Sequence, residues 1–201
     1  MSSLSASELP SFEKQGKVSV WCSSVSYDTI PESYFVEDEQ GLDAWAKNFN
    51  ISHYDPDNME TNGVESGTAF VRDILGPCSY SSAFGELVVH KVNKMGHQQV
   101  SWIILLFDFE YRNKLTKIHE DEIVQYVGSF VYDMDAITLD EQDEFERQRQ
   151  EAQAKLEAEA AALVEPELEP ESEPEPESEP EPESEQKITP KPGANNPWLK
   201  S

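Results

Sequence analysis

The apolar run Val100–Tyr111 (VSWIILLFDFEY) places the strongest constraint on how this chain folds. Six consecutive apolar residues, Trp102–Phe107, are mostly β-branched or aromatic, a composition that favours a strand buried on both faces. Aromatic and acidic residues then alternate from Phe107 to Tyr111, as in a strand with one face in water. The run therefore predicts a central strand that carries Asp108 and Glu110 from the core to a solvent-facing rim.

The segments around this strand predict an α+β fold. Lys17–Ser23 alternates as a half-buried strand, and Glu122–Tyr132 is expected to pair antiparallel with the central strand across a hairpin. Residues 51–63 contain turn residues. Apolar spacing predicts three helices, at Gly41–Phe49, Thr68–Leu75 and Ser79–Met95. We therefore expect a small, mainly antiparallel sheet with a few packed helices.

Composition divides the chain into four segments. Residues 1–16 are Ser-rich and polar, and we expect a disordered lead-in; residues 17–137 are expected to form the α+β domain. Residues 138–164 are rich in Ala and Glu and predict a charged helix, with Leu139 and Phe145 as apolar anchors. Most other apolar residues there are Ala, which favours a solvated rod over a coiled coil.

Residues 165–201 form a Glu/Pro-rich tail that we expect to be disordered and acidic. Its repeated Glu-Pro pairs favour an extended, polyproline-like spacer. The chain ends in NPWLKS, where Trp198-Leu199 is either a short docking motif or part of a disordered terminus.

The charge is strongly negative, with 40 acidic and 15 basic residues and a formal net charge of −25. Residues 1–139 and 140–201 are both acidic. Such a chain repels nucleic acid and anionic membrane and attracts cationic proteins, although acidity also serves plain solubility. The sequence shows no apolar signal segment and no membrane-length apolar stretch, so we expect a cytoplasmic protein.

Signatures of catalysis and metal binding are weak. The sequence has no Gly-rich phosphate loop, no GxSxG and no HExxH. Cys22 and Cys78 have no CxxC spacing and are expected to be reduced thiols. A cysteine–histidine pair that meets only in space stays an alternative. The histidines are scattered without metal-ligand spacing: His53, His90, His97 and His119.

The segment beginning Asp55-Pro56-Asp57 does not make a calcium loop. An EF-hand needs an oxygen ligand at its fifth position, Gly at its sixth and Glu at its twelfth, where this chain has Met59, Glu60 and Ser66. No metal and no other cofactor are expected.

Exposed acids beside aromatic residues are the remaining signal. Aromatic side chains give rigid contact area and carboxylates accept forked hydrogen bonds from Arg, a combination suited to a basic protein surface. An ordinary solvated acidic face is the alternative. The candidate contact residues are Tyr54, Asp55, Asp57, Glu60, Asp108 and Glu110.

Four stretches, VSVW, WAKNFNISHYDPDNME, WIILLFDFEY and YVGSFVYD, resemble the immunity protein 22 family of bacterial polymorphic-toxin systems. That family has an N-terminal strand with Trp, a Phe-x-x-Asp-Phe-x-Ile segment running into Tyr-Asp-x-Asp, and an apolar strand ending in Phe/Tyr-x-Phe-Glu-Tyr. The resemblance covers Lys17–Asp133. It departs at Trp45 and Asn48, where the family commonly has Phe and Asp, and residues 140–201 lie outside the family core.

The resemblance implies a non-catalytic protein that binds and neutralises a cognate toxin domain. If the toxin is a nuclease, its cationic groove suits an acidic surface that covers it, and charge speeds the encounter. Two alternatives remain at this stage. One is a protein-binding adaptor that presents its C-terminal segment, and the other is a small hydrolase that uses Cys22 or Cys78.

Overall fold

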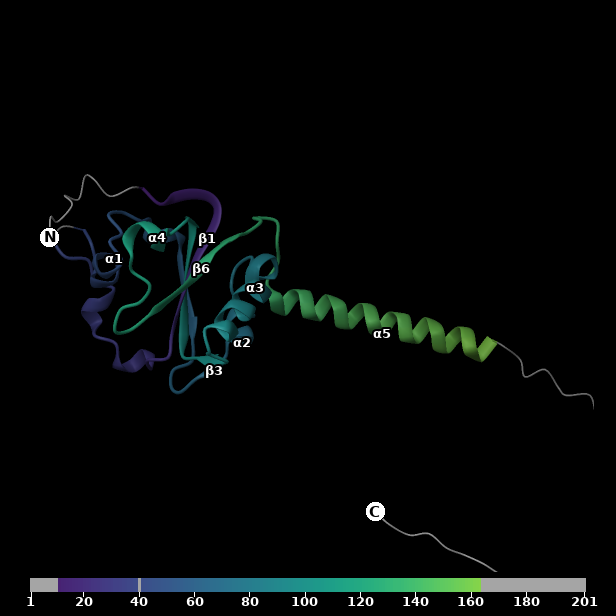
Figure 1. Ribbon diagram of the computed structural model, residues 1–201. Helices are drawn as coiled ribbons and strands as arrows, with labels where there is room; N and C mark the ends of the chain where they lie inside the picture. The colour runs from purple at the N-terminus through teal and green to yellow at the C-terminus, as the bar shows by residue number, and fades with distance from the viewer. Residues whose placement is uncertain (1–10, 40, 164–201) are drawn as a thin grey trace, which may run out of the picture.

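The computed structural model describes residues 11–39 and 41–163 (Figure 1). Its strands and α-helices, with three 3-10 turns, follow this order: β1 (Glu13–Ser23), η2 (Tyr27–Thr29), η3 (Glu32–Tyr34), α1 (Ala44–Asn48), η4 (Pro56–Asn58), β2 (Met59–Gly63), β3 (Ala69–Phe70), α2 (Val71–Leu75), α3 (Ser81–Lys94), β4 (Gln99–Val100), β5 (Trp102–Phe109), α4 (Asn113–Thr116), β6 (Gln125–Val131) and α5 (Leu139–Leu163).

Four of these strands form one antiparallel sheet in the order β2-β5-β1-β6. β5 is buried from Trp102 to Leu106 and lies between β2 and β1, as the composition of the apolar run predicts. β3 and β4 pair separately. The predicted fold class, α+β with a small antiparallel sheet and packed helices, is confirmed.

The predicted hairpin between β5 and β6 is wrong, because β6 pairs with β1. Residues 59–63, which the sequence suggested were part of a turn region, form β2 and occupy one side of β5, while β1 occupies the other. The connection of residues 110–124 contains α4 and is longer than a tight hairpin loop. It carries the chain past β1 to the free side of that strand.

β1 also begins earlier than predicted, at Glu13 instead of Lys17, so the lead-in expected over residues 1–16 is partly strand. The pairing register with β5 shifts between Glu13 and Val18, and Gly16 has a φ of +72°. This bulged start is exposed and polar, so it has no apolar alternation for sequence analysis to detect.

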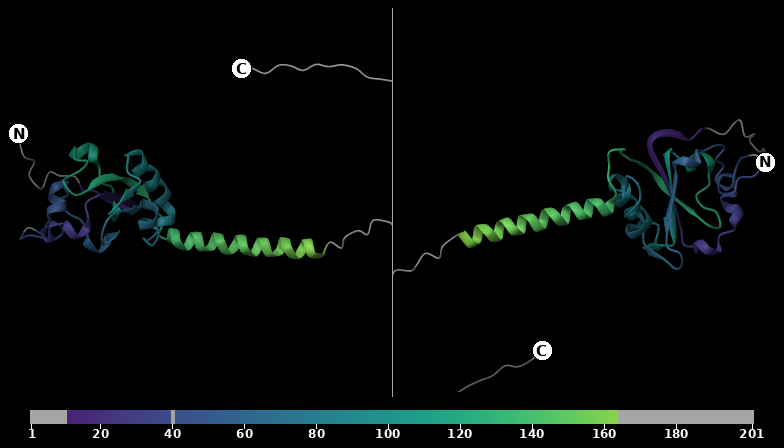
Figure 2. Two further views of the ribbon diagram at one scale, coloured as in Figure 1. Left: turned by 90° about the horizontal axis from the view of Figure 1, so that it is seen from below. Right: turned by 180° about the vertical axis from the view of Figure 1, so that it is seen from behind.

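The sheet separates two hydrophobic clusters. On one face Val20 and Leu105 pack with residues of α2 and α3 such as Val88. On the other face the cluster is mainly aromatic and includes residues of α1. The Trp21 ring meets Trp45 edge-on at 5.0 Å and Tyr111 at 5.4 Å, arrangements that favour aromatic pairs. Figure 2 shows the sheet between these two layers from further directions.

α5 leaves the domain as a long helix, as predicted, but its first turn is part of the core (Figures 1 and 2). Thr138 and Glu141 form a reciprocal cap: the Thr138 backbone N–H donates to Glu141 Oε2 at 2.9 Å, and the Glu141 N–H donates to Thr138 Oγ1 at 3.1 Å. Leu139 is only 1% exposed and packs where Gly85 leaves space.

Polar contacts fix the direction of α5. The Leu139 N–H donates to Ser81 Oγ at 2.8 Å, and the Asp140 N–H donates to the Gly76 carbonyl at 3.1 Å. Arg72 of α2 makes a two-pronged ion pair with Asp143, at 2.7 and 2.9 Å. From residue 143 to residue 162 the helix is exposed. The tail expected over residues 165–201, including Trp198-Leu199, lies outside the described residues.

Candidate partner-binding surface

The six candidate contact residues come from two places: residues 54–60, which include η4 and the start of β2, and residues 108–110 at the end of β5. Because β2 pairs with β5, these two places are neighbours: Met59 lies opposite Leu106 and Glu60 opposite Leu105. The structure therefore brings the two groups together, but the individual side chains have different surroundings.

Asp108 is half-buried and hydrogen-bonded within the chain. Its Oδ1 accepts hydrogen bonds from the Gly16 backbone N–H and from the Tyr132 hydroxyl, both at 2.8 Å. Its φ of +52° places it in the left-handed region that Asp and Asn tolerate better than most residues. The carboxylate thus joins the bulge of β1 to the end of β6.

The backbone at Asp108 also changes which face the following residues occupy. Phe107 packs with the cluster on the α3 side, whereas Phe109 and Tyr111 belong to the aromatic cluster on the other side. The alternation of aromatic and acidic residues from Phe107 to Tyr111 therefore does not mark one buried and one solvent-facing side of a regular strand. Tyr111, at its end, is buried.

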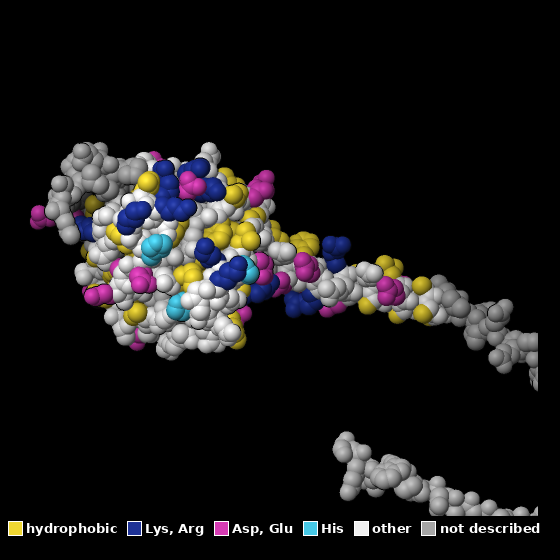
Figure 3. Space-filling view, viewed as in Figure 1, with side chains coloured by type: hydrophobic (Ala, Val, Ile, Leu, Met, Phe, Trp, Pro, Cys, Tyr) yellow, Lys and Arg dark blue, Asp and Glu magenta, His cyan; other side chains and the backbone are white. Residues whose placement is uncertain are grey.

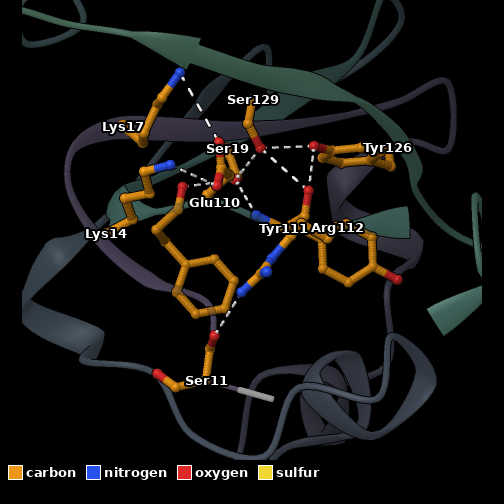
Figure 4. Close-up of polar contacts among 10 residues, drawn as sticks. Ser11, Lys14, Lys17, Ser19, Glu110, Tyr111, Arg112, Tyr126 and Ser129 are labelled. Atoms are coloured by element: carbon orange, nitrogen blue, oxygen red, sulfur yellow. Dashed lines mark hydrogen bonds and ion pairs between the residues drawn. The ribbon is translucent and has the colours of Figure 1, made fainter. Parts of the chain in front are cut away.

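Glu110 is surrounded by cations of the same chain (Figure 4). Its carboxylate lies 3.0 Å from Lys14 Nζ and 3.9 Å from Lys17 Nζ. The hydrogen bond from Lys14 lowers the pKa of Glu110, and the charges of Lys14, Lys17 and Arg112 act in the same direction. The positive charges around Glu110 therefore exceed its own negative charge.

A buried polar network lies beside this ion cluster (Figure 4). Ser19 Oγ accepts from the Tyr111 N–H at 2.8 Å and lies 2.7 Å from Ser129 Oγ. The Tyr126 hydroxyl donates to the Tyr111 carbonyl at 2.7 Å. These bonds connect β1, β6 and the residue that follows Glu110, so they hold the rim where β5 ends.

Tyr54 and Glu60 also bind within the chain, on opposite sides of the sheet. The Tyr54 hydroxyl donates to Asp43, the buried residue that caps α1, and the Tyr54 ring meets Trp45 at 5.3 Å. Burial and the bond to Asp43 raise the pKa of Tyr54. The Glu60 carboxylate accepts from the Ser79 N–H, at 3.1 and 3.3 Å, on the α3 side.

Asp55 and Asp57 are the two exposed candidates. Asp55 caps η4 by accepting from the Asp57 N–H at 3.0 Å, and Pro56 stiffens the turn. The Asp57 carboxylate forms no hydrogen bond and no ion pair with the described residues. Both carboxylates lie on a short, fixed turn and are exposed to solvent, where a partner can reach them.

A hollow of about 360 Å³ lies beside η4 and unites residues from three elements. Glu13 and Lys14 of β1, Asp55 and Asn58 of the η4 turn, and residues 106–109 of β5 line it. We call Glu13, Asp55, Asp57 and Asn58 the η4 surface. A partner side chain that enters this hollow meets carboxylates, among them that of Asp55, together with the Lys14 side chain, whereas Leu106 and Phe109 are almost fully buried.

A second acidic site was not identified from the sequence. Residues 120–122 (Glu-Asp-Glu) line a hollow of about 560 Å³ together with Tyr34 and Asn48. Asp121 is committed internally, because it accepts from the Tyr34 hydroxyl at 2.7 Å and from Asn48 Nδ2 at 2.8 Å. The three adjacent acids were visible in the sequence, but the pattern assigned Glu122 to a strand, and β6 begins only at Gln125.

The cysteines offer little support for nucleophilic chemistry. Both thiols are buried, and burial raises the pKa of Cys22 and of Cys78 to about 12. At neutral pH such groups are protonated thiols rather than nucleophilic thiolates. In residues 11–39 and 41–163, no three or more His, Cys, Asp or Glu side chains are grouped to hold a metal ion. Over the same residues, no helix has the length and apolar character needed to cross a bilayer.

Comparison with known proteins gives one match. The family model described as Immunity protein 22 matches residues 18–133, which is more than half of the chain and runs from within β1 to just after β6. The matched range also contains the η4 surface from Asp55 to Asn58. No curated protein and no solved structure matches the chain.

Proposed function

The chain belongs to the immunity protein 22 family, and on that premise we propose that it protects its own cell by binding a cognate toxin domain without catalysis. Family membership supports the toxin-neutralising role. Our further proposals concern the mechanism: the toxin is a nuclease, the protein acts in the cytoplasm, and the two proteins meet through an acidic surface.

The η4 surface carries this proposal. Asp55 and Asp57 are exposed carboxylates on a fixed turn, beside a hollow large enough to receive a side chain. A nuclease domain presents Lys and Arg side chains toward phosphate groups, and Arg pairs well with carboxylates. The net charge of −25 adds long-range attraction that speeds the encounter. The η4 surface therefore suits a basic groove.

The other four candidates have different roles in this proposal. Tyr54 and Asp108 position the η4 surface, through Asp43 and through the β1 bulge respectively. Glu60 fastens β2 to the start of α3 through Ser79, and Glu110 balances Lys14 and Lys17 at the edge of the same hollow. The direct contacts are assigned to Asp55 and Asp57.

The test measures binding of the full chain to the toxin domain encoded by the neighbouring gene. In the Asp55→Asn/Asp57→Asn variant, Asn at position 55 retains the oxygen that caps η4. The variant therefore removes both negative charges and keeps the cap. We expect the affinity to fall about tenfold or more and its salt dependence to weaken. The control is Glu65→Gln/Asp135→Asn, which removes the same charge at exposed positions elsewhere.

Two outcomes would contradict different parts of the proposal. Equal affinity and salt dependence in the wild type and the Asp55/Asp57 variant would exclude the acidic contact surface while leaving the toxin role. Failure of the wild type to bind the toxin domain, together with failure to rescue cells that express it, would exclude the toxin role. Protection by a chain that lacks residues 165–201 would show that the C-terminal adaptor is not the main function.

A further inference from the structure

The outer side of β6 is an open sheet edge. Among the described strands, only β1 pairs with β6. The first part of the outer side is covered, because the Tyr126 N–H donates to the His119 carbonyl at 2.7 Å. Beyond the bulge in β6, residues 128–131 have no such hydrogen-bonded neighbour among the described residues, which leave a short stretch of the edge free.

The backbone direction along this stretch follows from the pairing with β1. The N–H of Tyr132, just after β6, donates to the Gly16 carbonyl of β1 at 3.2 Å. In an antiparallel pair, alternate residues direct their N–H and C=O groups toward the partner and away from it. Ser129 and Val131 therefore direct their backbone groups away from β1, where another strand can bind them.

A hollow of about 420 Å³ lies beside this edge. Lys91 of α3 and Met95, the residue that follows α3, line it together with Asn113, His119 and residues 125–130. Gly128 has no side chain to fill the space, and the Phe130 ring lies next to it. An extended segment has room here beside apolar atoms.

The charge at this edge is opposite to that of the chain as a whole. Among the described residues that line the hollow, Lys91 is the one Lys or Arg and there is no carboxylate; the nearby Glu120 carboxylate accepts a hydrogen bond from Gln125. Lys91 forms no ion pair with any described residue. Where β6 ends, Lys17 lies opposite Val131 and belongs to the cation group around Glu110. In Figure 3, which faces this side, dark-blue Lys and Arg side chains flank yellow hydrophobic ones.

We infer that the free edge of β6 is a docking site for an extended, acidic segment of the toxin domain, which adds to the sheet as a further strand; this inference rests on the proposed function. Backbone hydrogen bonds to Ser129 and Val131 supply the pairing, and a carboxylate of the segment meets Lys91. A second copy of this chain would place equal charges against each other. The Glu-Pro repeats are also poorly suited, because Pro has no N–H to donate.

The test again uses the full chain and the toxin domain encoded by the neighbouring gene. Val131→Pro removes only an outward N–H, because Val131 does not donate to β1, and its side chain is 63% exposed. Lys91→Glu reverses the charge beside the hollow. We expect each variant to weaken binding about tenfold, and the wild-type amides of Ser129 and Val131 to exchange hydrogen more slowly once the toxin domain is bound.

The controls are Val36→Pro, another strongly exposed apolar position, and Lys117→Glu, both expected to bind like the wild type. If Val131→Pro lowers the thermal midpoint, Val131→Asp replaces it, because a carboxylate at the edge repels an acidic segment. Wild-type affinity in both edge variants, or unchanged exchange at Ser129 and Val131, would overturn the inference while the toxin role stands. Wild-type dimers that Val131→Pro converts to monomers would overturn it in favour of a second copy.

Discussion

The Asp108 carboxylate accepts a hydrogen bond from the Tyr132 hydroxyl at 2.8 Å, and this contact joins the end of β5 to the residue after β6 across the width of β1. The same oxygen accepts the Gly16 N–H, so three segments meet at one carboxylate. An acid that the sequence suggested as a partner contact is thus also part of the framework of the rim.

We predict that Asp108→Ala lowers the free energy of unfolding by about 2–4 kcal/mol, because it leaves the Gly16 N–H without an acceptor and places Ala at a positive φ. Asp108→Asn keeps an acceptor oxygen and tolerates this φ, so most of the stability should remain. Urea unfolding followed by tryptophan fluorescence measures both. Equal stability of Asp108→Ala and the wild type would mean that the carboxylate does not hold the rim.

A second prediction concerns the first turn of α5. Leu139→Ala should lower the free energy of unfolding by about 2–5 kcal/mol, because Leu139 is 1% exposed and its removal leaves a cavity against α3. The matched control is Leu156→Ala on the same helix, where the side chain is 67% exposed and the change should be within about 0.5 kcal/mol. Comparable effects of the two substitutions would show that α5 does not contribute to the core.

The third prediction is a loss of stability in alkali. Burial raises the pKa of Tyr111, Tyr126 and Tyr132 to about 12 from an ordinary value of 10, and those of both cysteines to about 12 from 9. The folded chain therefore keeps these protons after the unfolded chain has released them. The free energy of unfolding should be little affected by these groups below about pH 8 and should fall as the pH rises from there toward 12.

Urea titrations across this pH range measure the slope, and Tyr132→Phe provides the comparison. For Tyr132, desolvation is the larger cause of the raised pKa and the hydrogen bond to Asp108 the second. The variant loses one of the shifted groups, so its stability should decline less steeply than that of the wild type above about pH 10. A constant free energy of unfolding up to pH 12 would contradict the prediction.

The sequence predicts the elements whose signal is local. β5 is recognisable because a strand buried on both faces is apolar throughout, and α5 because Ala and Glu favour a helix over its whole length. β2 is different: Met59–Gly63 is polar and rich in turn residues, and it is a strand because the open side of β5 supplies its hydrogen bonds. Without β2, pairing β6 with β5 was the simplest arrangement.

The candidate site is predictable to the same extent. Turn chemistry around Pro56 correctly suggests that Asp55 and Asp57 are exposed. The partners of Tyr54 and Glu60, which are Asp43 and Ser79, depend on how separate elements pack, and no local pattern shows them. The prediction at Asp108 assumed a regular strand. The positive φ of Asp108 turns the side chains of Phe109 and Tyr111 to the opposite face of the sheet from Phe107, and no local sequence pattern shows this.

The anchoring of α5 also determines how the chain is laid out in space. A helix of 25 residues is about 37 Å long at roughly 1.5 Å per residue, which exceeds the diameter of a small domain. Because Ser81, Gly76 and Arg72 bind its first turns, the direction of the helix axis relative to the sheet is fixed. The helix therefore projects from the sheet by more than the width of a small domain, and its exposed surface from residue 143 to residue 162 stands clear of the core.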